Sequence, residues 1–146
     1  MTQNNPLELI EKLETGIPGF DFLSEGGLPK GRATLIAGTA GSAKTVFACQ
    51  FLAEGIKNGE NGVFVTFEEP PQALRKNMGG FGWNFRQWEE NRQWAFVDAS
   101  PQPEEKPMVT GEYDLGALIA RIEFAIRKNK AKRVSMDSLG AIFSHL

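Results

Sequence analysis

The sequence lacks the features that mark secreted and membrane-spanning proteins. Its 146 residues include a single cysteine, Cys49, so no disulfide can form within the chain. No apolar run approaches the ~18 residues that a membrane-spanning helix needs. Residues 1–5 are polar and carry no apolar segment of the kind found in a secretory signal. These absences favour a cytosolic protein, in which Cys49 serves packing rather than reactivity.

A strong net charge is also missing. The 16 basic and 18 acidic residues give a net charge of −2 at pH 7, which provides no electrostatic basis for binding nucleic acid or acidic lipid. The only histidine, His145, stands next to the last residue, and we interpret it as incidental. The length is sufficient for one domain with a sizeable core.

Glycine, by contrast, is plentiful, and one glycine-rich stretch carries the strongest functional signal. Residues 38–45 read GTAGSAKT, which matches the phosphate-binding P-loop except that Ala43 replaces the second glycine. Between a strand and a helix, such a loop directs backbone N–H groups and the positive helix end at a polyphosphate. Lys44 then reaches the β- and γ-phosphates, and the Thr45 hydroxyl binds Mg²⁺. The alternative is a glycine-rich turn that binds no ligand.

Strands and helices are expected to alternate along the chain. We predict strands over residues 33–37, 63–67, 95–98 and 133–136, and helices over residues 44–56, 71–78 and 114–128. This alternation predicts an α/β fold, with a parallel sheet flanked by helices on both faces. Residues 100–112 form a long, proline-containing loop, and such loops are often functional or mobile.

Acidic side chains are expected at the same sheet edge as the P-loop. Glu68 and Glu69 directly follow the predicted strand 63–67, and ligands bind beyond the carboxyl ends of parallel strands. A carboxylate there can orient or deprotonate the water that attacks a γ-phosphate. The alternative is a solvated acidic pair that stabilises the start of the next helix.

The strand 133–136 is followed by Asp137, which is the form of a Walker B element whose aspartate holds Mg²⁺. Three tryptophans, Trp83, Trp88 and Trp94, fall between the second predicted helix and the third predicted strand. Stacking on a nucleic-acid base or adenine is conceivable for them, but we expect them to serve packing.

Together these motifs resemble the KaiC family. The resemblance rests on LETGIPGFD at residues 13–21, GGLPKG at residues 26–31, the P-loop and VTFEE at residues 65–69. KaiC proteins are ATPases and autokinases of the cyanobacterial circadian clock and belong to the RecA-like P-loop superfamily. The resemblance implies a P-loop NTPase with a RecA-like parallel sheet. It also implies a lead over residues 1–12 and an ATP-binding domain over residues 13–146 that is incomplete at its C-terminus.

The resemblance implies roles for individual residues. The residues that would contact ATP are Gly38, Gly41, Ser42, Ala43, Lys44, Thr45 and Val46. Glu68 resembles the catalytic base, Glu69 its partner, and Asp137 the Mg²⁺-binding Walker B acid. The spacing from Met1 resembles that of the first of the family's two ATPase domains, which hydrolyses ATP slowly, forms homo-hexamers and binds KaiB. Residues 102–113 resemble the region where KaiB docks.

The sequence also departs from the family pattern. Ala43 places a methyl group where the P-loop has glycine, and Gly80 stands where the family often has a nucleotide-contacting serine. The later strands of a RecA-like domain and its neighbour-facing basic residues have no counterpart. Two other readings therefore stay open: a RecA/RadA-like DNA recombination ATPase, and a P-loop interaction module that does not hydrolyse ATP.

Overall fold

A computed structural model describes residues 10–39, 43–101 and 115–140. Its centre is a parallel three-stranded sheet in the order β4-β3-β5, formed by β3 (Gly62–Thr66), β4 (Trp94–Asp98) and β5 (Arg133–Asp137). Thr66 lies opposite Asp98 on one neighbour and opposite Asp137 on the other. The carboxyl ends of all three strands therefore meet at one edge of the sheet. This confirms the predicted α/β fold with a parallel sheet.

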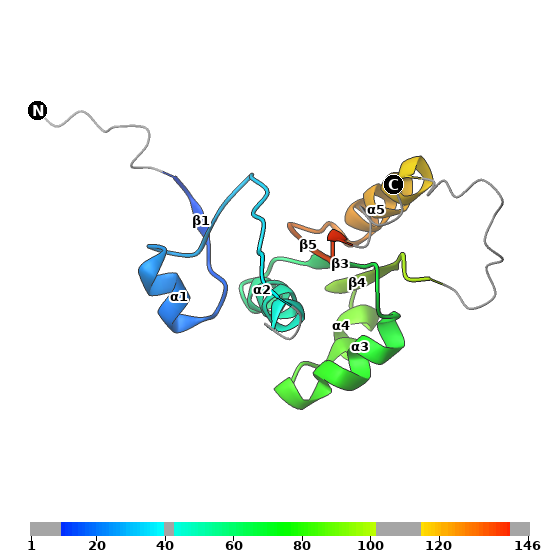
Figure 1. The fold of residues 1–146 in the computed structure, drawn as a ribbon, viewed down its shortest axis with the longest axis horizontal. Helices are drawn as coiled ribbons and strands as arrows, with labels where there is room; N and C mark the ends of the chain where they lie inside the picture. The colour runs from blue at the N-terminus through cyan, green and yellow to red at the C-terminus, as the bar shows by residue number, and fades with distance from the viewer. Residues whose placement is uncertain (1–9, 40–42, 102–114, 141–146) are drawn as a thin grey trace, which may run out of the picture.

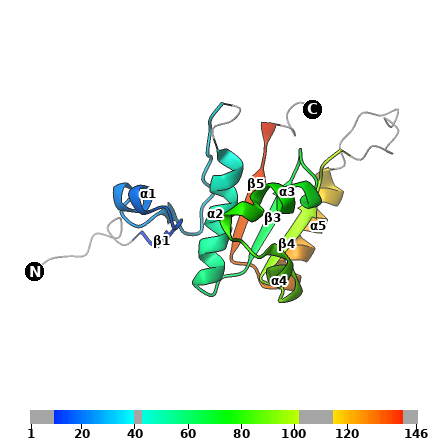
Figure 2. The same ribbon diagram turned by 90° about the horizontal axis from the view of Figure 1, so that it is seen from below.

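Helices cover both faces of this sheet (Figures 1 and 2). One face is covered by α2 (Lys44–Lys57), α3 (Pro71–Met78) and α4 (Phe85–Glu90), and the other by α5 (Leu115–Asn129). The side chains of β3 alternate between the two layers, because successive residues of a strand point to opposite faces. Phe64 packs with Leu52 and Trp94 under α2, whereas Val63 and Val65 pack against α5.

The tryptophans serve packing, as expected. Trp94 is 1% exposed and stacks on Trp88 at a ring-centroid distance of 5.8 Å. Trp83 and Trp88 lie partly buried against the same cluster. Cys49 is also buried in this layer, which confirms its packing role. No helix among the described residues has the length and apolar character needed to cross a bilayer.

One predicted strand is wrong. Residues 33–37 run extended and exposed, and they do not pair with any strand. They lie alongside β5, and a cavity of about 650 Å³ separates them from it. A strand needs hydrogen bonds to a neighbouring strand, and the cavity keeps residues 33–37 from forming them with β5. The other predicted helices and strands are present with ends shifted by at most one residue.

The N-terminal segment forms a small arm against α2 (Figure 1). It contains β1 (Lys12–Leu13), α1 (Pro18–Leu23) and β2 (Leu28–Pro29), and β1 pairs antiparallel with β2. In this arm the Asp21 carboxylate accepts hydrogen bonds from the Thr15 hydroxyl at 2.7 Å and from the backbone amides of Thr15 and Gly16. The turn is closed by these bonds.

Arg133 fastens the arm to the body of the protein. Its guanidinium is buried and donates to the backbone carbonyls of Glu14 at 2.6 Å and Phe51 at 2.9 Å. It also forms an ion pair with Glu60 at 3.0 Å. One side chain from β5 thereby joins the arm, helix α2 and the loop before β3.

Candidate functional site

The predicted P-loop leads directly into helix α2. Lys44 is the first residue of α2, and Ala43 before it adopts a left-handed backbone conformation with φ 64° and ψ 26°. The Lys44 ammonium donates to the Gly38 carbonyl at 2.8 Å, so both ends of the loop are in contact. Val46 is half-buried in the first turn of α2. Gly41 and Ser42 lie outside the described residues.

Thr45 and Asp137, predicted as a magnesium pair, are in direct contact. The Thr45 hydroxyl donates to the Asp137 carboxylate at 2.6 Å, across 92 residues of sequence. Nearby on β5 the Ser135 hydroxyl donates to the Ala48 carbonyl at 2.9 Å, which fastens α2 to the strand. Burial raises the pKa of the Cys49 thiol to about 12, and the Asp137 carboxylate contributes to this rise.

The donor set of this pair suits Mg²⁺. A hydroxyl and a carboxylate are oxygen ligands of the kind that this ion prefers. The described residues contain no group of three or more His, Cys, Asp and Glu side chains that could hold a metal. Mg²⁺ at Thr45 and Asp137 would therefore need further oxygens from water and from a nucleotide, which is its usual arrangement in ATP-binding sites.

Glu68 and Glu69 lie at the same sheet edge and point to different partners. The backbone amide of Phe67 donates to the Asp137 carbonyl at 2.8 Å. The pairing of β3 with β5 therefore continues one residue beyond the end of β3. Glu68 then accepts a hydrogen bond from the Ser138 hydroxyl at 3.2 Å. Glu69 accepts from the Asn77 amide on α3 at 3.3 Å. Glu68 is therefore the acid that faces the end of β5.

Ser138 is the residue at this edge that our sequence analysis missed. The sequence signal was available, because Ser138 directly follows the predicted Walker B aspartate. The contact with Glu68 depends on the strand register, which pairs Thr66 with Asp137. Gly80, the other departure from the family pattern, lies in the short 3₁₀ turn η2 (Gly79–Phe81), and a β-carbon at this position would meet open space.

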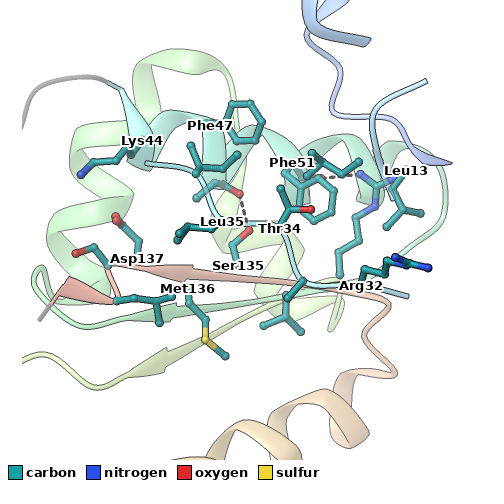
Figure 3. A pocket seen from close by; sticks show the side chains of 18 of the residues that line it. Leu13, Arg32, Thr34, Leu35, Lys44, Phe47, Phe51, Ser135, Met136 and Asp137 are labelled. Atoms are coloured by element: carbon teal, nitrogen blue, oxygen red, sulfur yellow. Dashed lines mark hydrogen bonds between the residues drawn. The ribbon is translucent and has the colours of Figure 1, made fainter. Parts of the chain in front are cut away.

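The cavity beside β5 reaches the site at one end only. Figure 3 shows Lys44 and Asp137 at that end, and Leu13 and Arg32 at the other. Between them the wall is largely apolar and includes Leu35 and Met136. Such an apolar wall does not suit a triphosphate. We therefore interpret the cavity as a packing gap between residues 31–36 and the sheet, not as a nucleotide site. The predicted phosphate site, the loop around Lys44, touches this cavity only at that end.

Two predicted features cannot be placed. Residues 102–113, compared with the KaiB-docking region, lie outside the described residues, as does His145.

Comparison with known proteins supports the predicted resemblance. Residues 13–146 match the family model described as "ATPase: KaiC". The chain is 80% identical over 137 residues to the circadian clock protein KaiC3 of Synechocystis sp.. This match covers 94% of this chain and 27% of that protein. It is 52% identical over 135 residues to the circadian clock oscillator protein KaiC of Parasynechococcus marenigrum, covering 92% and 26%. The chain thus spans about a quarter of the length of these relatives.

Proposed function

Because the chain belongs to the KaiC family of ATPases, we propose that it binds Mg²⁺ and ATP at the loop around Lys44 and hydrolyses ATP slowly in the cytosol, as part of a KaiC-type clock protein. The observation that carries the proposal is the contact between Thr45 and Asp137. It joins the first turn of α2 to the carboxyl end of β5, with Lys44 adjacent. This is the arrangement that a P-loop and a Walker B acid need in order to share one metal.

Each residue of the site has a role in this proposal. The Lys44 ammonium and the backbone N–H groups of the loop bind the phosphates. Thr45 and Asp137 hold Mg²⁺, which neutralises charge that develops on the phosphate oxygens. Glu68 orients and deprotonates the attacking water, because its carboxylate lies at the same sheet edge. Glu69 accepts a hydrogen bond from Asn77 on α3, and it acts as the partner of Glu68, farther from the end of β5.

The partners that we propose follow from the relatives, which are named as circadian clock proteins. We propose that the protein acts with other Kai proteins, including KaiB, and that a homo-hexamer with ATP between subunits is its working form. The RecA/RadA-like alternative predicts stimulation of hydrolysis by DNA. The net charge of −2 argues against it.

Nucleotide binding is tested by Lys44→Ala in a titration with Mg²⁺ and ATP. Loss of charge-assisted hydrogen bonds worth about 1.5–3 kcal/mol lowers affinity by roughly 10- to 100-fold. Lys57→Ala, at the far end of the same helix and exposed, is the matched control and keeps the parent affinity. Equal affinity of the Lys44 variant and the parent for ATP would contradict the proposed function.

Hydrolysis is tested by Glu68→Gln in a chimera, in which this chain replaces the matching segment of Synechocystis KaiC3. A general base contributes about 10²–10⁴-fold to the rate, so turnover falls by that order while ATP affinity is kept. Unchanged turnover would return Glu68 to the role of a helix-stabilising acid. Binding without any turnover in the parent chimera would favour the non-catalytic interaction module.

A further inference from the structure

The end of β5 supplies two side chains in succession, and both engage the candidate site. Asp137 accepts a hydrogen bond from Thr45 at 2.6 Å, and Ser138 donates one to Glu68 Oε1 at 3.2 Å. A connected series therefore runs from the first turn of α2 through the end of β5 to the loop after β3. Asp137 already has a role in binding Mg²⁺ in our proposal, whereas the Ser138 hydroxyl has none.

The backbone determines that Ser138 meets Glu68 rather than Glu69. Thr66 is in register with Asp137, and the Phe67 amide donates to the Asp137 carbonyl at 2.8 Å. The next residues on the two segments, Glu68 and Ser138, are thus brought side by side. Past Glu68 the chain turns away, because the buried Thr66 hydroxyl donates to the Glu69 carbonyl.

A carboxylate that serves as a base needs a defined orientation. The Ser138 hydroxyl can donate one proton, and it occupies a single oxygen of Glu68. The other oxygen, Oε2, stays available to accept a hydrogen bond from water. Within the described part of the chain, Glu68 forms no further side-chain hydrogen bond or ion pair that would orient it, whereas Glu69 accepts a hydrogen bond from Asn77.

We propose that Ser138 is a positioning residue, which holds the Glu68 carboxylate at the carboxyl edge of the sheet with Oε2 free for the attacking water. Ser138 does not take part in proton transfer itself. The catalytic consequence rests on the proposed ATPase function, but the hydrogen bond to Glu68 does not, so the two are tested separately.

The first experiment needs no nucleotide. The carboxyl resonance of Glu68 is recorded in the full 146-residue chain labelled with ¹³C, at a concentration at which sedimentation shows it to be monomeric. The parent, Ser138→Ala, Ser138→Thr and Asn77→Ala are compared at one pH. Loss of the hydroxyl in Ser138→Ala moves the Glu68 resonance. Threonine keeps a hydroxyl and leaves it near the parent position, and Asn77→Ala moves the Glu69 resonance instead. Identical Glu68 resonances in the parent and Ser138→Ala overturn the proposal, whatever the protein does with ATP.

The second experiment measures single-turnover hydrolysis in the KaiC3 chimera. The loss of one hydrogen bond to a charged group is expected to slow hydrolysis by about 10-fold in Ser138→Ala, with ATP affinity unchanged and with Ser138→Thr restoring the parent rate. In a Glu68→Gln background, Ser138→Ala has no further effect, because both substitutions remove the same function. Additive losses, or a loss that threonine fails to rescue, would overturn the positioning role. If the parent chimera binds no ATP, the proposed function fails while the first experiment still decides the contact.

Discussion

At the scale of single residues, Ala43 is the clearest point of strain. It occupies the left-handed region with φ 64°, where a β-carbon costs roughly 1–2 kcal/mol. The replaced glycine of the P-loop pattern would adopt this conformation freely. The departure from the P-loop pattern at this position therefore carries a cost in conformational free energy.

We predict that Ala43→Gly raises the free energy of unfolding by about 1 kcal/mol, measured by urea denaturation. Ala48→Gly is the control, because Ala48 lies within α2 and glycine there costs roughly 0.5–1 kcal/mol. The two substitutions thus change stability in opposite directions. A decrease for both would show that Ala43 is not strained in solution.

Residue by residue, the sequence predicted what a local motif can encode. The P-loop pattern led to Lys44 and Thr45, and the strand-plus-aspartate pattern led to Asp137. The bond between Thr45 and Asp137 confirms that these elements share one edge. The roles of these residues in binding and hydrolysis stay predictions. Ser138 was missed because its contact depends on the register of two strands 70 residues apart, which no local motif contains.

At the scale of elements, the turn between β1 and α1 in the arm is closed by the carboxylate of Asp21. Burial by itself would raise the pKa of Asp21, but hydrogen bonds from the Thr15 hydroxyl and from the Thr15 and Gly16 amides, together with the charge of Arg133, lower it below its ordinary 3.8. A lowered pKa in the folded state means that ionised Asp21 stabilises the arm at pH values above about 3.8. This stabilisation is lost as the pH falls through the folded-state pKa.

We therefore predict that the arm loosens below about pH 4 while the sheet is still folded. The ¹H–¹⁵N signals of Thr15 and Gly16 are expected to shift with pH in this range and to return on neutralisation. Asp21→Asn is the control, because an amide does not titrate there. A pH-independent Thr15 signal in the parent would contradict this account of the turn.

Elements were predicted well where their own periodicity decides them. α2, α3 and α5 and the three strands of the sheet were found from apolar spacing. Residues 33–37 have the composition of a strand as well, yet they do not pair. Whether a segment forms a strand depends on its neighbours in space, because the hydrogen bonds of a strand are made to other segments. The short α1 and α4 were missed because six residues give too little periodic signal.

At the scale of the whole molecule, exposed apolar side chains line the cavity beside β5 on both of its walls, with Leu35 on the segment 31–36 and Met136 on β5. Leu35 is 75% exposed and Met136 is 44% exposed. Among the described residues, β5 forms strand pairs with β3 alone. An unpaired strand edge next to apolar side chains is a place where further chains can associate.

We predict that the purified chain of residues 1–146 forms oligomers of mixed size, with weak nucleotide binding and ATP turnover near background. Met136→Lys is expected to shift the distribution toward monomer in sedimentation velocity experiments. Phe124→Lys, at an exposed apolar position on α5, is the control and leaves the distribution unchanged. A uniform hexamer with Lys44-dependent turnover would show that the chain is self-sufficient.

The position of Arg133 also bears on how the protein is made. The carbonyl of Glu14 that it holds is 119 residues earlier in the chain. At a synthesis rate of 5–20 residues per second, the arm waits roughly 6–24 s for its anchor to be translated. The arm is thus made well before the strand that anchors it, and its attachment to β5 is among the last contacts to form.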